Sequence, residues 1–300
     1  SRLIAQNVRH SGLSFVYGEL LTHGRGSEIY VRDAAGLEGQ PFGDLACRFE
    51  DAIVLGIARG DAGTCSPLLA PPPDTRLERG DRVVLAAAGL QYTQPRDATP
   101  PKRTAPRLLQ RTARERPLRV LLLGWNRKVP ALLREFDSYT DEQFEIDIVS
   151  TQSVTSREAA LNRQDLRPQR IAVRHVEGDY AATSLRHRVD VNAYDRIVLL
   201  GSARFETGEE SDARTIMGYL LLRDLLPASG GPGVLIELLD PGNVSLFQHR
   251  RGEVIVSPVI LSHMLAQVAL RRELRAVFDE LFGPGGAEIV FRPAAEFGLL

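Results

Sequence analysis

Residues 118–265 alternate short apolar runs with amphipathic segments, and this alternation constrains the fold more than any other feature of the chain. Runs of Leu, Ile and Val are typical of strands buried on both faces, and the segments between them have helical periodicity. Strands separated by helices predict right-handed crossovers and a parallel sheet with helices on both sides. The expected class is α/β, a Rossmann-like doubly wound sheet. We expect strands at 119–123, 144–149, 171–175, 196–200, 234–238 and 253–256, and helices at 129–138, 156–162, 181–189, 211–225 and 241–247.

A smaller α+β unit is expected before this sheet, at residues 26–90. Short β-prone runs there are separated by turn residues, a pattern typical of a compact sheet with short helices. Strands are expected at 28–31, 52–59 and 82–86, a turn into a short helix at 37–42, a loop at 67–73 and a turn at 77–81.

The remaining segments connect or flank these two units. Residues 1–22 have an apolar helical stripe interrupted near Gly12, and residues 91–117 are rich in Pro, Arg, Thr and Gln, as in a linker. Further helices are expected from Pro258 to about 272 and at 274–282, and a strand at 288–291. The predicted division is therefore 1–25, 26–90, 91–117, 118–272 and 273–300. The first segment is expected to be a helix that leaves a preceding Rossmann lobe, and the last to be a crossover helix followed by the start of a second small α+β unit. Both chain ends are interpreted as cuts in a longer polypeptide.

Composition excludes several classes of protein. Apolar residues make up 43% and charged residues 25%, as in ordinary globular proteins. The chain has 37 Lys and Arg against 38 Asp and Glu, a balance that argues against a nucleic-acid partner. No apolar run reaches the roughly 18–20 residues that cross a bilayer. The two cysteines are expected to be ordinary thiols.

The turn after the first large-sheet strand lies where a dinucleotide fold has its Gly-x-Gly-x-x-Gly motif. Only the first glycine, Gly124, is present; Asn126 and Val129 occupy the other two positions. The next strand, 146–150, has no acidic residue at its end to hold a ribose. These departures disfavour NAD. Gly124, Asn126 and Arg127 remain candidates for a nucleotide or anion site, because a loop before a helix offers free amides.

Two polar clusters follow later strands. Gly178 and Asp179 come after the third strand, where they either form a turn and helix cap or line the crevice beyond the strand ends. Four carboxylates follow the fourth strand: Glu206, Glu209, Glu210 and Asp212. Calcium prefers six to eight hard oxygen ligands, so this loop is a candidate Ca²⁺ site. The alternative is that these charges complement a helix dipole, with Ser211 or Asp212 as the cap.

No nucleophile–base or phosphate-binding motif is present. The sequence lacks a Gly-x-Ser-x-Gly elbow, a His-Glu-x-x-His pair and a Gly-Lys-Ser/Thr loop, and its six histidines are scattered. The sequence therefore favours a binding protein over an enzyme.

The order of several short motifs resembles the cytosolic gating region of the CASTOR/POLLUX ion channels, which carry RCK (regulator of K⁺ conductance) domains. Each motif is weak alone, but the whole set appears in the family's order. The residues that carry the resemblance are Glu28-Ile29-Tyr30-Val31, Leu37-Glu38-Gly39-Gln40-Pro41-Phe42, Leu77-Glu78-Arg79-Gly80-Asp81, Gly124-Trp125-Asn126-Arg127, Asp212-Ala213-Arg214, Leu220-Leu221-Leu222-Arg223-Asp224, Ile236-Glu237-Leu238-Leu239-Asp240 and Val277-Phe278-Asp279-Glu280-Leu281-Phe282.

This resemblance implies a non-enzymatic regulatory region that assembles as a homotetrameric ring of double-RCK subunits below a cation pore, on the cytoplasmic face of a membrane. Calcium is the ligand implied by the plant members. The apolar helix near residues 257–270 is the expected subunit contact, through Val259, Leu261, Met264 and Leu265. The alternative function is an NAD(P)-binding regulator or oxidoreductase.

Overall fold

The computed structural model describes residues 1–21, 26–60, 65–98, 116–201, 207–247, 252–283 and 286–294. The chain forms two compact units, and each combines segments that are distant in the sequence. We call them the Rossmann unit, residues 1–14 and 111–259, and the antiparallel unit, residues 15–110 and 260–300.

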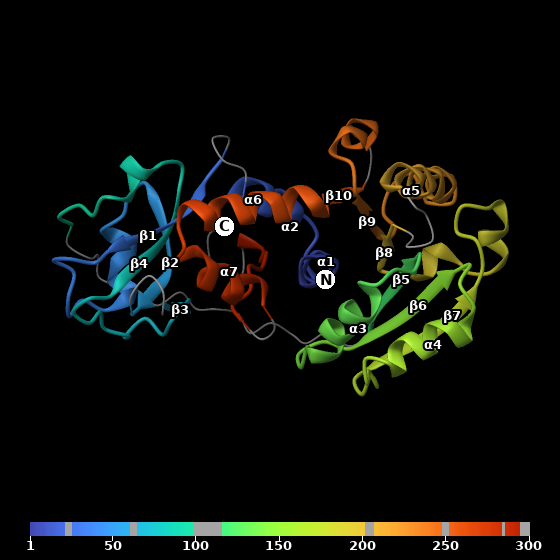
Figure 1. The fold of residues 1–300 in the computed structure, drawn as a ribbon, viewed down its shortest axis with the longest axis horizontal. Coiled ribbons are helices and arrows are strands. Elements are labelled where there is room, and N and C mark those ends of the chain that lie inside the picture. Colours follow the sequence, from blue (N-terminus) through green and yellow to red (C-terminus); the bar gives the residue numbers. More distant parts are fainter. Residues whose placement is uncertain are drawn as a thin grey trace. The chain divides into compact units, whose positions relative to one another are not determined.

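The Rossmann unit contains a six-stranded sheet in the order β10-β9-β8-β5-β6-β7, with every neighbouring pair parallel (Figure 1). The first strand along the chain, β5, therefore lies in the middle, and the order reverses between β5 and β8. This is the doubly wound order of Rossmann folds, so the predicted fold class is confirmed. The strands are β5 (Leu118–Leu123), β6 (Phe144–Ser150), β7 (Ile171–Glu177), β8 (Arg196–Leu199), β9 (Gly233–Leu238) and β10 (Glu253–Val256).

Helices cover both faces of this sheet. Helices α3 (Val129–Ser138) and α4 (Val154–Asn162) lie along one face and α5 (Gly208–Arg223) along the other (Figure 1). On the α5 face, Leu121, Leu123 and Leu199 of the strands join Tyr219 and Leu222 of α5 in one buried cluster. The short helix α1 (Arg2–Arg9) packs on α3.

Two expected helices of the Rossmann unit are 3-10 turns. Residues 181–189 contain only η3 (Thr183–His187), which is followed by η4 (Val191–Ala193), and residues 241–247 form η5 (Pro241–Phe247). Leu185 and Val189 have helical spacing, but Leu185 reaches the core from η3 and Val189 from the segment between η3 and η4. The Asp190 side chain accepts a hydrogen bond from the Asn192 N–H at 3.0 Å, which favours a turn over a continuing helix.

The antiparallel unit is built on a four-stranded sheet in the order β1-β4-β2-β3, with every neighbouring pair antiparallel. Its core cluster includes Tyr30, Ile57, Val83 and Leu85, covered by Leu45 of η1 (Phe42–Cys47). The strands are β1 (Glu28–Asp33), β2 (Ala52–Arg59), β3 (Ser66–Leu69) and β4 (Arg82–Ala87).

Strand β3 corrects the prediction of a loop at 67–73. Pro67 argues against a central strand, but β3 is an edge strand, where proline is tolerated. The expected helix at 1–22 is two helices, α1 and α2 (Leu13–Leu21), because Gly12 adopts a φ of +96° between them.

Helices from the C-terminal part of the chain belong to this same unit. The Gln267 side chain of α6 (Ser257–Leu270) donates to the Leu21 carbonyl of α2 at 3.0 Å, and α7 (Leu274–Phe282) packs on β3 and β1. Residues 273–283 therefore belong to the first small unit, and the predicted helix at 274–282 is observed as α7.

The expected strand at 288–291 is not observed. These residues are irregular, since a β-prone run forms a strand only where a neighbouring edge accepts its hydrogen bonds. Within the expected linker, Thr93 of η2 (Leu90–Thr93) is buried and the Arg96 N–H donates to the Arg48 carbonyl at 2.8 Å. Residues 91–98 thus pack on the antiparallel unit, and 99–115 lie outside the described residues. None of the described helices is long and apolar enough to cross a membrane.

Candidate ligand crevice

The reversal of strand order between β5 and β8 locates the candidate site. In open α/β sheets, ligands bind outside the carboxyl ends of the strands at such a point. The turns after β5 and β7 contain Gly124, Asn126, Arg127, Gly178 and Asp179, so the structure brings all five predicted candidates to this edge of the sheet.

Gly124 is required by the packing of the sheet itself. Its φ is +109°, and an added Cβ would lie 2.5 Å from the Leu200 carbonyl oxygen at the end of β8. Its N–H donates to the Val149 carbonyl at 2.9 Å. The one glycine that matches the dinucleotide motif therefore serves the contact between β5 and β8.

Asn126 joins the two strand ends at the reversal point. Its Nδ2 donates to the Gly201 carbonyl at 2.8 Å, and its Oδ1 accepts the Lys128 N–H at 2.9 Å. Arg127 is exposed, while Val129 is fully buried in α3 at the position of the third motif glycine. The side chains of Asn126 and Val129 thus fix this turn at two positions where a dinucleotide-binding fold has glycine.

The neighbouring end of β6 is filled by large side chains. Trp125 is buried, and its ring centroid lies 6.0 Å from that of His175. The fully buried Arg157 of α4 donates to the Ile148 carbonyl at 2.9 Å and the Val176 carbonyl at 3.1 Å. Burial, and then the charge of Arg157, lower the pKa of His175, so its imidazole stays neutral at pH 7.

Asp179 has a structural role at the end of β7. Its Oδ1 accepts a hydrogen bond from the Ala181 N–H at 2.8 Å and forms an ion pair with Arg214 of α5. The Arg214 guanidinium also lies 5.3 Å from the centre of the Tyr180 ring. Gly178 does not have a positive φ, so the turn that it forms does not require glycine.

The structure describes three of the four carboxylates of the predicted calcium site. Glu206 lies outside the described residues, and Glu209 and Glu210 are exposed in the first turn of α5. The cap of α5 is Thr207, whose hydroxyl accepts the Glu210 N–H at 3.2 Å. The expectation of a cap at Ser211 or Asp212 was therefore wrong, since the helix begins one turn earlier.

Asp212 is fully buried and holds the end of β9. Its carboxylate accepts the N–H groups of Leu239 and Asp240, each at 2.9 Å, and the Asn243 Nδ2 at 3.0 Å. Three donors occupy the oxygens that a calcium ion would need. Among the residues that the structure describes, no group of three or more His, Cys, Asp or Glu is placed to hold a metal ion. A calcium site that includes Glu206 stays a prediction.

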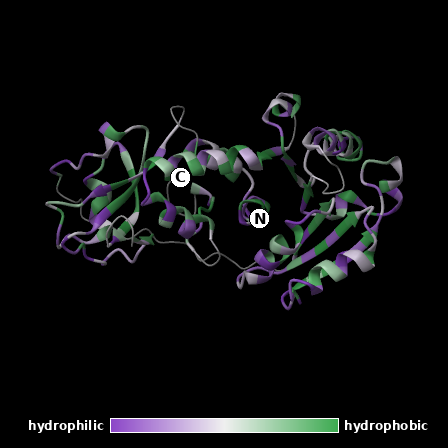
Figure 2. Cartoon of the chain, viewed as in Figure 1, coloured by the Kyte–Doolittle hydropathy of each residue, from purple (hydrophilic) through white to green (hydrophobic). Residues whose placement is uncertain are grey.

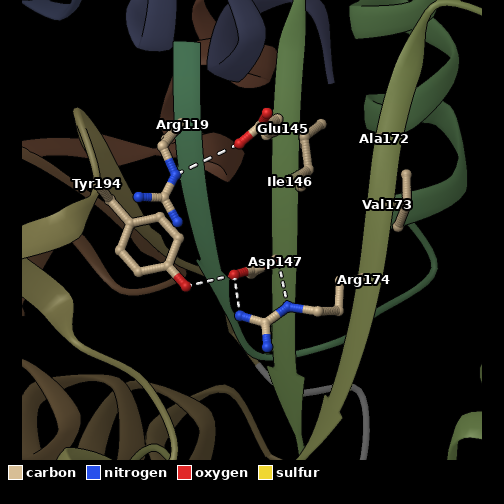
Figure 3. Close-up of a pocket in the computed structure, with 8 residues that line it drawn as sticks. All are labelled: Arg119, Glu145, Ile146, Asp147, Ala172, Val173, Arg174 and Tyr194. Atoms are coloured by element: carbon tan, nitrogen blue, oxygen red, sulfur yellow. Dashed lines mark hydrogen bonds and ion pairs between the residues drawn. The ribbon is translucent and has the colours of Figure 1, made fainter. Parts of the chain in front are cut away.

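A second polar cluster, absent from our sequence-based candidates, lies on the sheet face (Figure 3). Arg119, Glu145, Asp147 and Arg174 of β5, β6 and β7 turn toward one another beside Tyr194, and they line a cavity of about 290 Å³. The sequence signal was available: charged residues interrupt strands that are otherwise apolar. They are tolerated because opposite charges pair, Arg119 with Glu145 and Arg174 with Asp147.

Asp147 is the centre of this cluster. Its carboxylate accepts Arg174 Nε at 2.9 Å and also bonds Arg174 Nη2 and the Tyr194 hydroxyl. Burial alone would raise the pKa of Asp147, but the hydrogen bonds from Arg174 and Tyr194 hold it below its usual value. Burial and Asp147 together raise the pKa of Tyr194 to about 12. The charges satisfy one another, so the cluster ties the β7–β8 crossover to the sheet.

This pairing predicts a pH dependence. A carboxyl whose folded-state pKa is depressed contributes stability above its unfolded pKa and loses it as pH falls through the folded pKa. We expect Asp147→Asn to lower the unfolding free energy by about 2 kcal/mol at pH 7, the size of a hydrogen-bonded charge. The difference from the parent chain should shrink below about pH 4. Denaturant unfolding from pH 7 to 3 measures it, with Glu145→Gln, half-exposed on the same strand, as the control. An undiminished difference at pH 3 would contradict this account of the cluster.

The predicted interface residues lie on α6. Leu261 is 57% exposed and Leu265 is 62% exposed, whereas Met264 and Val259 are half-buried. Gln267, on the opposite side of the helix, is buried against α2. Figure 2 shows that α6 is mostly hydrophobic along its length. Helix α5 adds an apolar residue that the sequence analysis missed, Met217, which is 51% exposed.

Sequence comparisons relate the chain to plant channels. Residues 1–103 match the family described as "Castor and Pollux, part of voltage-gated ion channel". The chain is 25% identical to the probable ion channel CASTOR of Oryza sativa subsp. japonica, over 98% of this chain and 36% of that protein. It is 23% identical to the probable ion channel POLLUX of Arabidopsis thaliana, over 98% of this chain and 39% of that protein. The chain thus spans little more than a third of the length of these relatives.

The fold has a solved counterpart. The structure of the human SLO3 gating ring superposes with a TM-score of 0.68, at 15% identity, over 95% of this chain and 60% of that one. This likeness concerns the fold, and it covers both units. By sequence, the chain is similar to the CASTOR and POLLUX ion channels over 98% of its length, and its first 103 residues match the Castor and Pollux family.

Proposed function

We propose that this chain is the ligand-sensing regulatory region of a cation channel, on the cytoplasmic face of a membrane, and that it catalyses no reaction. The observation that carries the proposal is the sequence match to CASTOR and POLLUX ion channels over 98% of the chain. The likeness in fold to a gating ring supports it, since a ligand that binds one packing arrangement better than another shifts the population toward that arrangement.

The side-chain contacts at the strand reversal point support a receptor over an NAD(P)-dependent oxidoreductase. Gly124 and Asn126 are engaged in joining β5 to β8, and Val129 fills the third glycine position. We therefore disfavour NAD(P) as a coenzyme, and we retain calcium, through Glu206, Glu209 and Glu210, as one ligand to test.

A thermal-shift screen with Ca²⁺, K⁺, Na⁺, NAD and ATP, combined with an NADH oxidation assay, tests the proposal. We expect at least one of these ligands to raise the melting temperature and no NADH turnover with any added carbonyl substrate. Micromolar NADH binding with turnover would contradict the receptor function and favour the oxidoreductase.

We further propose that the chain assembles as a homo-oligomer, a tetramer in the complete channel, through the exposed face of α6. Leu261 and Leu265 lie one turn apart, and an apolar helix face of this kind is typical of a subunit contact.

Leu265→Glu is expected to weaken self-association at least about thirtyfold, because a charge buried at the centre of an interface costs roughly 2 kcal/mol or more. Light scattering across a concentration series measures the effect. Leu90→Glu is the control, since Leu90 is similarly exposed at 51% but lies outside α6. Equal self-association of the two variants would rule out α6 as the contact.

A further inference from the structure

Glu237, near the end of β9, is a buried carboxylate with two donors on the same oxygen. Only 1% of the residue is exposed. Its Oε1 accepts both the Lys128 ammonium and the Ser257 hydroxyl. Its Oε2 is also buried, and it has no hydrogen-bond partner within the described part of the chain. A buried carboxylate with one free oxygen is costly, so Glu237 depends strongly on these two donors.

Lys128 connects Glu237 to the crevice. It lies in the turn between β5 and α3, and its N–H donates to Asn126 Oδ1 at 2.9 Å. Asn126 in turn donates to the Gly201 carbonyl beyond β8 at 2.8 Å. Two sets of hydrogen bonds, joined by the side chain of Lys128, therefore link the strand reversal point to Glu237.

Ser257 connects Glu237 to α6. It is the first residue of that helix, which begins in the Rossmann unit and continues into the antiparallel unit from Ile260. The same helix carries the exposed Leu261 and Leu265. One carboxylate oxygen thus holds both the crevice turn and the start of the helix shared by the two units.

The two donors differ in how easily they can leave. The Lys128 side chain is 41% exposed, whereas that of Glu237 is 2% exposed. The ammonium itself can therefore bind solvent or a ligand in place of Glu237, but Glu237 would then keep only Ser257 as a donor, which is costly for a buried carboxylate. Such an imbalance is what a two-state switch needs, because a small change at one end alters a costly buried group at the other.

We propose that Lys128, Glu237 and Ser257 form the connection through which events at the crevice change the start of α6. The inference rests on the proposed regulatory function, and it names the residues that carry the signal. Movement of the Lys128 ammonium away from Glu237 leaves the buried carboxylate short of donors, so that Glu237 shifts toward solvent and releases Ser257 at the first turn of α6. The result is a change in the conformation of α6, and therefore in its exposed face with Leu261 and Leu265.

A double-mutant cycle tests this connection without any ligand. Hydrogen–deuterium exchange is followed at the amides of residues 261–264, whose N–H groups bond the carbonyls of 257–260 in an α-helix. We expect Lys128→Met to raise their exchange rates about tenfold, the factor expected from losing a charge-assisted hydrogen bond. Ser257→Ala is expected to raise them about threefold, and the double variant no more than Lys128→Met alone, because both donors act through Glu237.

Two matched variants complete the design. Arg127→Met removes the adjacent exposed charge of the same turn and is expected to leave the α6 amides unchanged. Glu237→Gln removes the buried charge, so Lys128→Met should have no further effect in that background. The inference is overturned if the Lys128 and Ser257 effects multiply independently, or if the β5 amides of residues 121–123 speed up by the same factor as those of α6. Because no channel or ligand enters the experiment, failure here leaves the proposed function standing.

Discussion

Asp212→Ala is expected to lower the unfolding free energy of the Rossmann unit by about 3–5 kcal/mol. The substitution leaves the N–H groups of Leu239 and Asp240 and the Asn243 amide without their acceptor in a fully buried position. Loss of a charged acceptor that serves three donors is among the most destabilising single changes. Urea unfolding followed by circular dichroism measures the loss.

The control separates a structural carboxylate from a calcium ligand. Glu209→Ala and Glu210→Ala, in the exposed first turn of α5, should each cost less than about 1 kcal/mol, through the helix dipole alone. The Asp212→Ala loss should be the same with calcium and with a chelator. A loss that appears only when calcium is present would show that Asp212 is a metal ligand and that our interpretation of its hydrogen bonds is wrong.

Gly124→Ala is expected to cost at least about 3 kcal/mol, for two separate reasons. A φ of +109° is strained for any residue with a Cβ, which costs about 1–2 kcal/mol. The new methyl group would also lie 2.5 Å from the Leu200 carbonyl oxygen, so β5 and β8 would have to separate.

Gly230→Ala isolates the first of these costs. Gly230 lies in the same unit with a φ of +69°, and nothing lies within 4 Å of an added Cβ. It should lose about 1 kcal/mol. Equal losses at the two glycines would show that the approach of β5 to β8 is not a constraint at Gly124. Thermal unfolding of the two variants, side by side, gives the comparison.

The parallel sheet could be predicted from the sequence because its strands are apolar runs and its crossovers have one favoured hand. The connection from β7 to β8 could not, since Leu185 and Val189 suit a helix and a pair of 3-10 turns equally well. Strand β3 was missed because Pro67 indicates a loop unless the strand is known to be at an edge.

The site was only partly predictable, for a similar reason. Sequence position brings Gly124, Asn126 and Asp179 to the strand ends, because each follows a strand of a parallel sheet. What their side chains bond depends on partners distant in the sequence. Asp212, for example, accepts hydrogen bonds from residues 27 and 28 positions later. The sequence therefore suggested a calcium ligand, whereas in the structure Asp212 holds the end of β9. The Asp147 cluster was overlooked because its members are spread over three strands and the loop residue Tyr194.

The central claim is that this region controls a cation pore by changing its own packing. Cation flux through proteoliposomes that contain the complete channel is the most direct test, with and without Leu265→Glu in this region. We expect cation flux in the parent protein. In the variant, the flux per amount of reconstituted protein should change by more than about fivefold. Flux that is identical in both proteins, or absent from the parent, would contradict a regulatory role for this region.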